Sequence, residues 1–428
     1  MTPHEAIDQL SRALVERPHA PDLHTGLGIA YCQLERYAAA LAHYARAVEL
    51  APEDAAVHNN LGTVLTELGR PAEAVPHLER AIALHPAYPE ALNNLGIALA
   101  ALGRYTEAAR RSRAALKLKP GYAKAIRNLR VIYQNQVPLW HFPMMNDEVR
   151  NAAFDDAIRA CVKPDSLVLD IGTGSGLLAM MAARAGARRV YTCEMVPLIA
   201  DKAREIVRRN GLAKTVTVIA RKSSELIVGE DLPARADVLI TETFDVGLLG
   251  EGAVPTIEHA RLELLMPQAR IVPAGATVSA MLVESESLMR KGSVGEAAGF
   301  DLSAFNEYRP VSYQQPVSPG MDCRRLSDDF ELFSFDFRGL PIAPAERRIH
   351  VRPSSDGTCH GVVYWYRLQI DDERFISTAP GDGPSHWKQT VQLFLPPVQV
   401  RGGQMLDLIA AHDRLSLSVQ LAREPVRE

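Results

Sequence analysis

The sequence predicts three consecutive modules: an all-α repeat solenoid, a Rossmann-like α/β module with a parallel sheet, and a mostly antiparallel β-barrel module. Three observations support this. The first 130 residues repeat with a period of 34, a strand–glycine–helix–strand pattern begins near residue 165, and β-rich segments separated by Pro and Gly follow Pro273. We place the modules at residues 1–134, 135–272 and 273–428.

Three markers share the 34-residue period, and together they predict tetratricopeptide repeats. In such repeats, small residues lie where two helices cross and proline follows the second helix. Residues 3–18 and 122–134 are expected to be a leading and a closing helix. The markers are Pro18, Pro52, Pro86 and Pro120; Gly28, Gly62 and Gly96; and Ala47, Ala81 and Ala115.

Asn60, Asn94 and Asn128 keep the same period and are candidates for the inner face of the solenoid. Their amides would either bind the backbone of an extended peptide partner or satisfy neighbouring helix ends. The pattern leaves both interpretations open.

The second module contains the turn of a nucleoside-binding site. LVLDI reads as a short strand, and Gly172, Gly174 and Gly176 follow it in a G-x-G-x-G pattern. Glycines allow a tight turn and a close approach of a ligand to the backbone. Asp170 ends this strand and Glu194 ends the next, where a carboxylate accepts ribose hydroxyls. The G-x-G-x-x-G pyrophosphate pattern is absent, which favours S-adenosyl-L-methionine over a dinucleotide as the cofactor.

Two further acids, Glu242 and Glu251, lie in the glycine-rich segment TETFDVGLLGEG. A loop that folds back would bring both carboxylates to one pocket, and facing carboxylates need a cation between them. A planar guanidinium fits this requirement. The spacing alone slightly favours the alternative, two solvent-facing acids in a glycine-rich loop.

The rest of the chain has ordinary globular composition, with 47% hydrophobic and 23% charged residues. The net charge of −4 argues against a nucleic-acid partner. Five dispersed cysteines without a C-x-x-C pair argue against disulfides and a metal site. No signal-peptide core and no apolar run of bilayer length are present, so we expect a cytoplasmic protein without a membrane partner.

VLDIGTGSGLL, Glu194, TETFDVGLLGEG and SHWKQTV, in this order, resemble the protein arginine methyltransferase family over residues 135–428. The resemblance implies transfer of a methyl group from S-adenosylmethionine to arginine in proteins, with Glu242 and Glu251 as the catalytic double-E pair. Within the family, the sequence is most similar to members whose hairpin reads E-x-x-D, one of which also carries tetratricopeptide repeats.

The resemblance also implies further site residues, since HFPMMNDEVRNAAFDDAI looks like the family's N-terminal helix. Arg150 would bind the cofactor carboxylate, and Asp147 would pair with His386 as a route for the proton or as a structural tie. Ser224 falls where relatives have a glutamate that binds adenine. Met144, Phe244 and Trp387 would line the arginine site, and Ser385 replaces the first residue of the family's THW loop.

These E-x-x-D relatives carry two tandem catalytic modules, whereas this sequence contains one set of motifs. The resemblance therefore implies a homodimer, with residues 299–308 as the dimerisation arm. The repeats would recruit the protein substrate or another partner. Two rival hypotheses are a methyltransferase for a small-molecule acceptor and a repeat scaffold with a vestigial catalytic module.

Overall fold

The computed structural model describes residues 1–318, 320–339, 341–382 and 386–422. The chain forms two compact units, Met1–Leu139 and Trp140–Glu428. No helix in these ranges is both long and apolar enough to cross a membrane. The cytoplasmic location and the division at residues 134 and 272 stay predictions.

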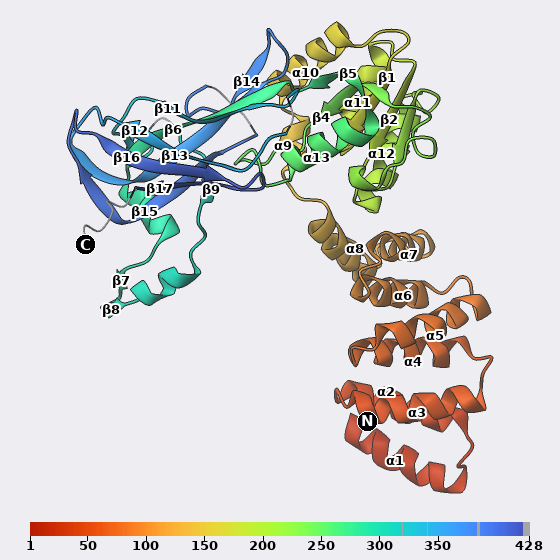
Figure 1. Ribbon diagram of the computed structural model, residues 1–428. Coiled ribbons are helices and arrows are strands. Elements are labelled where there is room, and N and C mark those ends of the chain that lie inside the picture. The colour runs from red at the N-terminus through yellow and green to blue at the C-terminus, as the bar shows by residue number, and fades with distance from the viewer. Residues whose placement is uncertain (319, 340, 383–385, 423–428) are drawn as a thin grey trace. The chain divides into compact units, whose positions relative to one another are not determined.

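The first unit consists of eight helices that stack in pairs (Figure 1). The predicted leading and closing helices are present as α1 and α8. The helices are α1 (Pro3–Glu16), α2 (Pro21–Gln33), α3 (Tyr37–Leu50), α4 (Ala55–Glu67), α5 (Pro71–Leu84), α6 (Pro89–Ala101), α7 (Tyr105–Leu118) and α8 (Ala123–Gln136).

The repeated glycines lie where the two helices of each repeat cross. A Cβ atom on Gly28 would lie 2.6 Å from the Tyr44 ring, and one on Gly62 would lie 2.5 Å from Leu78 Cγ. Both distances are far below van der Waals contact, so only glycine permits this approach. The 34-residue period is thus a packing requirement of each helix pair.

Two of the three repeated asparagines, Asn94 and Asn128, link successive repeats, whereas Asn60 Oδ1 accepts from its chain neighbour Asn59. Asn94 Nδ2 donates to Asn59 Oδ1 and to Thr63 Oγ1, both at 2.9 Å, and Asn128 Nδ2 donates to Asn93 Oδ1 at 2.7 Å. These amides therefore form side-chain hydrogen bonds that connect α4 to α6 and α6 to α8. They do not cap helix ends. Because they are only partly buried, their remaining hydrogen-bonding groups lie at the surface of these helices.

Two histidine pairs also recur at the repeat period. His24 Nδ1 lies 3.1 Å from His43 Nδ1, and His58 Nδ1 lies 3.2 Å from His77 Nδ1. His58 Nε2 lies 3.0 Å from a carbonyl oxygen, that of Pro52, so Nε2 carries the proton and Nδ1 accepts from His77. Burial, followed by the charge of the paired histidine, lowers the pKa of both His43 and His77.

The second unit begins with α9 (His141–Met145) and α10 (Glu148–Cys161), which precede a five-stranded parallel sheet. The strand order β3-β2-β1-β4-β5 places β1 in the centre. Its elements are β1 (Leu167–Ile171), α11 (Leu177–Arg184), β2 (Arg189–Cys193), α12 (Pro197–Arg209), β3 (Val216–Ile219), β4 (Ala236–Thr241), α13 (Ala253–His259), a π-helical turn (Ala260–Leu264) and β5 (Leu265–Val272).

The remaining strands pair antiparallel, as predicted, but the described strands form two open sheets and a two-stranded hairpin rather than a closed barrel. The larger sheet has seven strands and the smaller has three. Rings of Phe333 and Phe335 contact His412 at 4.6 and 5.1 Å and so pack one sheet on the other. The larger sheet comprises β6 (Gly275–Glu284), β9 (Tyr313–Gln315), β10 (Arg324–Arg325), β11 (Phe330–Asp336), β13 (Gly357–Gln369), β14 (Phe375–Ser377) and β15 (Gln389–Val400), and the smaller comprises β12 (Ala345–Val351), β16 (Leu406–His412) and β17 (Leu417–Leu421).

A segment between β6 and β9 projects from these sheets (Figure 1). It contains α14 (Glu286–Gly292), the short hairpin β7 (Glu296–Ala297) and β8 (Phe300–Asp301), and a 3₁₀ helix (Ser303–Tyr308). Phe300, Phe305 and Tyr308 are 71%, 69% and 75% exposed. The predicted dimerisation arm thus presents large apolar side chains to its surroundings.

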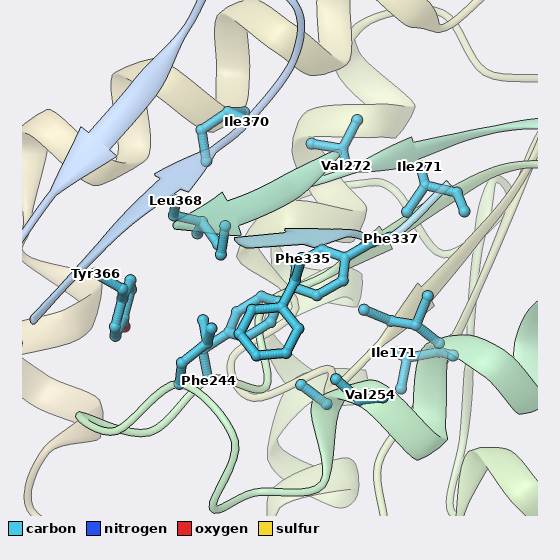
Figure 2. Packing of buried hydrophobic residues seen from close by; sticks show 14 of the residues in the cluster. Ile171, Phe244, Val254, Ile271, Val272, Phe335, Phe337, Tyr366, Leu368 and Ile370 are labelled. Carbon is cyan, nitrogen blue, oxygen red and sulfur yellow. The ribbon is translucent and has the colours of Figure 1, made fainter. Parts of the chain in front are cut away.

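The α/β and antiparallel parts share one hydrophobic core. Figure 2 shows Phe335 and Phe337 of the antiparallel part close to Phe244, which follows β4. The rings of Phe244 and Phe337 stack with centroids 5.6 Å apart. This packing positions the segment after β4, in which the two predicted catalytic glutamates lie.

The histidine pairs predict that the first two repeats loosen in acid. Because the folded-state pKa of His43 and His77 lies below the ordinary value of about 6.5, the unfolded chain binds protons more readily. Their contribution to stability is complete above about pH 6.5 and declines as the pH falls below it. We expect faster hydrogen exchange of α2–α5 at pH 5.5 than at pH 7.5, after correction for the intrinsic rates.

The third repeat is an internal control, since Leu92 and Arg111 occupy the positions of His58 and His77. A second control is the His43→Gln/His77→Gln variant, which keeps an amide donor but does not titrate. If hydrogen exchange in α6–α7 accelerated equally at pH 5.5, or if α2–α5 of this variant accelerated as much as in the wild type, the interpretation would be contradicted.

Candidate functional site

The order of the parallel strands brings three acid-bearing loops together. Because β2, β1 and β4 are neighbours, the loops at their carboxyl ends meet at one edge of the sheet. Asp170 is the penultimate residue of β1, Glu194 directly follows β2 and Glu242 directly follows β4. All three side chains are buried, so the fold gathers negative charge where water is largely excluded.

The glycine turn after β1 has the backbone geometry that its sequence predicted. Gly172 has φ +88°, and a Cβ atom there would lie 2.7 Å from Thr243 Cγ2. The N–H groups of Gly174 and Val196 donate to Glu194 at 3.1 and 2.9 Å. These two bonds hold the Glu194 carboxylate beside the turn.

Asp170 is a buried carboxylate with one unsatisfied oxygen. The Thr192 hydroxyl donates to Oδ2 at 2.6 Å, whereas Oδ1 has no hydrogen-bond partner among the described residues. Burial raises the pKa of Asp170 to about 7, against the opposing hydrogen bond from Thr192. Such an atom requires a donor, and an ammonium group would meet this need.

Arg150, in the first turn of α10, forms a buried ion pair with Glu242. Its Nη2 atom lies 2.6 Å from Glu242 Oε2, and the two side chains are only 3% and 5% exposed. Arg150 Nε has no hydrogen-bond partner among the described residues. Arg150 was predicted to bind the cofactor, so its pairing with the catalytic candidate Glu242 is a contact that sequence reasoning missed.

A tight loop holds Glu242 and Glu251 around Asp245. The Gly250 N–H donates to Asp245 Oδ1 at 2.9 Å, and a Cβ atom on Gly250 would lie 2.3 Å from Asp245 Oδ2. Leu248 has φ +76°, a left-handed conformation that non-glycine residues seldom adopt. The backbone of the loop between the two glutamates is therefore strained at Leu248, and the hydrogen bond from Gly250 to the Asp245 carboxylate closes the loop.

Glu242 and Glu251 line a common pocket with a cavity volume of about 130 Å³. Burial raises the pKa of Glu242, which Arg150 opposes. Desolvation, followed by the charges of Glu242 and Asp245, raises the pKa of the rim residue Glu251 to about 7. The pocket thus concentrates negative charge that a bound cation would stabilise. Its other described walls are Trp140, Met144, Phe244, Asp245, Val246, Gln314, His386, Trp387 and Lys388.

The loop before β15 closes the pocket from the antiparallel part. His386 Nδ1 lies 2.9 Å from Asp147 Oδ2, and Trp387 Nε1 donates to the Phe244 carbonyl at 3.2 Å. Burial lowers the pKa of His386, which Asp147 opposes. Burial raises the pKa of Asp147, but hydrogen bonds from the Arg150 N–H and from His386 outweigh it, and the net shift is downward. The pair is thus a neutral imidazole on an ionised carboxylate.

The structure therefore brings Glu242, Glu251, His386 and the predicted wall residues into one pocket, while their roles stay predictions. Ser224 lies apart, exposed in a 3₁₀ turn (Ser223–Glu225) after β3, and Ser385 lies outside the described residues. Sequence reasoning missed the remaining described walls, which are Trp140, Asp245, Val246, Gln314 and Lys388. Lys388 adjoins the recognised SHW segment, whereas nothing in the local sequence indicates Gln314.

Comparisons with known proteins agree with this geometry. Residues 274–419 match the arginine methyltransferase oligomerization subdomain, residues 155–243 match the ribosomal protein L11 methyltransferase model, and residues 19–87 and 59–123 match tetratricopeptide repeat models. An arginine N(omega)-methyltransferase of Streptomyces achromogenes is 37% identical over 290 residues, which cover 68% of this chain and 80% of that enzyme. This chain belongs to the protein arginine methyltransferase family.

Other relatives are longer than this chain. Protein arginine N-methyltransferase 7 of Oryza sativa is 37% identical over 320 residues, covering 66% of this chain and 44% of the relative. Protein arginine N-methyltransferase 9 of Mus musculus is 29% identical, with coverages of 60% and 34%. A Trypanosoma brucei enzyme–prozyme complex with AdoHcy has a TM-score of 0.58 and 25% identity, covering 67% of this chain and 94% of that chain.

The closed loop predicts that Gly250 tolerates no side chain. In a Gly250→Ala variant the Cβ atom would displace the Asp245 carboxylate and break its bond to the loop backbone. Losing a bond of this type costs about 1–3 kcal/mol, so we expect at least about fivefold faster hydrogen exchange across residues 245–252. Gly247→Ala is the matched control, because its Cβ atom would lie 3.6 Å from Asp245, an ordinary contact. Similar exchange in both variants would refute this role of Gly250.

Proposed function

We propose that this protein transfers methyl groups from S-adenosyl-L-methionine to guanidinium nitrogens of arginine in protein substrates. The observation that carries the proposal is the pocket with two carboxylates of raised pKa, Glu242 and Glu251. The Arg150 guanidinium already binds one oxygen of Glu242, which shows that this carboxylate accepts a guanidinium in the present backbone geometry. Glu251, at the rim, would contact the other side of an incoming arginine.

The residues beside the pocket fit the methionine end of the cofactor. Arg150 Nε is a buried donor without a partner, and Asp170 Oδ1 is a buried acceptor without a partner, within the part of the chain that is described. A carboxylate and an ammonium on the same molecule would satisfy both atoms. Glu194 would hold the ribose hydroxyls, and the exposed Ser224 is a weaker candidate for the adenine. When bound, the cofactor supplies an electrophilic methyl group on a sulfonium.

The two glutamates would orient the acceptor and polarise it. A guanidinium is a delocalised cation and a poor nucleophile, and carboxylates on two of its nitrogens concentrate positive charge there. The third nitrogen then carries more electron density and is held in one direction. As the N–C bond forms and the bond from the methyl group to the sulfonium breaks, leaving a neutral thioether, this nitrogen would lose a proton.

His386 would receive that proton. Its Nδ1 bonds to the ionised Asp147, so Nδ1 carries the proton and Nε2 is the basic nitrogen. The lowered pKa of His386 keeps the ring neutral near pH 7. The same bond also ties the loop before β15 to α10, so its catalytic and structural roles are compatible.

We further propose that two copies of the chain form a dimer through the antiparallel module. The two packed sheets of this module would correspond to the barrel that the sequence predicted. The match to an oligomerization subdomain and the exposed Phe300, Phe305 and Tyr308 support this. Each copy would supply one catalytic module, and the repeats would recruit the protein substrate.

A second candidate function is methylation of arginine itself. It is favoured by the 37% identity to an enzyme whose name, arginine N(omega)-methyltransferase, does not mention protein. An assay that compares free L-arginine with an arginine-containing protein separates the two substrate classes.

Replacing either glutamate tests the clamp. We expect Glu242→Gln and Glu251→Gln to lower kcat at least about a hundredfold, since each removes one charge that acts on the transition state. The measurement is transfer of labelled methyl to an arginine-containing protein, with cofactor affinity determined by calorimetry with S-adenosylhomocysteine. Turnover like that of the wild type in both variants would exclude the clamp, and absence of binding heat in the wild type would indicate a vestigial module.

The raised pKa of Glu251 predicts a pH-dependent acceptor site. Because only the ionised carboxylate attracts guanidinium, kcat/KM should rise with pH through about 7 and level off above it. Binding of an arginine peptide, followed by calorimetry, should show the same rise. In Glu251→Gln the peptide should bind more weakly and without this rise, so an identical pH profile would assign the titration to another group.

A further inference from the structure

The end of the solenoid carries a strong positive charge that the catalytic pocket does not use. Residues 1–103 contain 12 acidic and 6 basic residues, whereas residues 104–139 contain 9 basic residues and 1 acidic residue. The chain as a whole has a net charge of −4. The cationic stretch is thus a local feature of α7 and α8.

Part of this charge faces a hollow on the first helices of successive repeats. The hollow, with a cavity volume of about 270 Å³, is lined by residues of α4, α6 and α8, which follow one another along the solenoid (Figure 1). Lys124 and Arg127, on adjacent turns of α8, supply its cations, and Glu67 is an acid in its lining. Thr63, Thr66, Asn94, Ile97 and Asn128 complete the lining.

The two cations are available to a ligand. Arg104 pairs with Glu107 and Lys119 pairs with Glu90. In the fully described first unit, no carboxylate lies within ion-pair distance of Lys124 or Arg127. Both side chains are exposed, so a partner can reach them without a rearrangement of the helices.

The amides beside them suit an extended backbone. Asn128 uses one Nδ2 hydrogen for Asn93, and Asn94 Nδ2 is held by Asn59 and Thr63. These bonds fix the orientation of the amides without using every donor and acceptor of Asn128. Oriented amides next to two cations can bind a peptide backbone and a carboxylate on the same strand.

We propose that this hollow binds an acidic segment of a partner protein, with Lys124 and Arg127 as the carboxylate-binding residues. The cations of the hollow contrast with the carboxylates of the catalytic pocket, which would bind a cation. An arginine-rich segment is therefore repelled from the hollow and attracted to the pocket. If the proposed methyltransferase activity holds, the preferred substrates carry an acidic docking segment apart from the arginine that is methylated.

Docking of this kind changes affinity rather than chemistry. Because both units belong to one chain, an acidic segment held on the solenoid raises the local concentration of its own arginine. The effect appears in KM, while kcat stays unchanged. It is weakened by salt, because the attraction is between exposed charges.

Direct binding to the full-length protein tests the proposal without methyl transfer. The probe is a fluorescein-labelled 12-residue peptide of alternating Glu and Ser, compared with the same peptide carrying Gln for Glu and with a single-stranded RNA of equal charge. Fluorescence anisotropy should show salt-sensitive binding of the Glu peptide, at least about tenfold tighter than that of the other two.

Charge reversal in the hollow, Lys124→Glu/Arg127→Glu, should weaken binding of the Glu peptide about tenfold or more. Its matched control is Lys117→Glu/Arg130→Glu, which makes the same change of charge at two exposed residues outside the lining. The control should change the affinity less than threefold. Equal loss in both variants, or equal binding of the Glu and Gln peptides, would overturn the proposal, and preference for the RNA would assign the surface to nucleic acid.

A kinetic experiment then asks whether docking serves the reaction. An arginine peptide joined to the Glu segment by a Gly/Ser linker should have at least about fivefold lower KM than the unlinked peptide, with the same kcat. The charge-reversed hollow should abolish this difference. Binding of the Glu peptide without any methyl transfer would leave the docking site intact and refute only the proposed activity.

Discussion

The buried ion pair between Arg150 and Glu242 is the contact on which the catalytic unit depends. It joins the first turn of α10 to the segment after β4, and both partners are almost fully shielded from water. Breaking such a pair from one side leaves an uncompensated charge and costs about 3–5 kcal/mol. Burial raises the pKa of Glu242 and of the neighbouring Asp170. The charge of the same guanidinium opposes this rise at Glu242, and at Asp170 it does so together with the hydrogen bond from Thr192. One arginine thus favours the ionised form of two buried carboxylates.

Four separate parts of the chain build the pocket that Glu242 lines. Met144 comes from α9, the two glutamates come from the loop after β4, Gln314 comes from β9, and His386 and Trp387 come from the loop before β15. Trp387 is bonded to the Phe244 carbonyl, and the Phe244 ring is stacked on Phe337. The antiparallel module therefore lines the site and also supports it. A substitution in the core of this module would shift the Phe244 and Trp387 side chains that line the acceptor pocket.

The two units of the chain differ in their electrostatic preference. The catalytic pocket gathers carboxylates that a cation would stabilise, whereas the closing helix α8 presents the exposed cations Lys124 and Arg127. A partner that satisfies both units carries charges of both signs in separate segments. In the proposed arrangement, the pocket repels acidic segments and the hollow repels basic ones. The two sites would therefore not compete for the same segment of a partner. Polar side chains that link the repeats, such as Asn94 and Asn128, keep the solenoid ordered beside those cations.

The sequence by itself determined the features that arise from local geometry. The glycine period follows from the contact of Gly62 with Leu78 within one helix pair, and the turn at Gly172 follows directly from its strand, so both are visible in short windows. The motifs of the sequence, in a recognisable order, also predicted Glu242 and Glu251 as a pair, and the structure places both on one pocket. Only the tertiary structure decided that Arg150 pairs with Glu242, 92 residues away, that Gln314 joins the pocket wall and that the described antiparallel strands form open sheets rather than a closed barrel. The pKa of Glu251 belongs to this second group, because it depends on burial and on charges that folding brings near, and neither is encoded in the neighbouring residues.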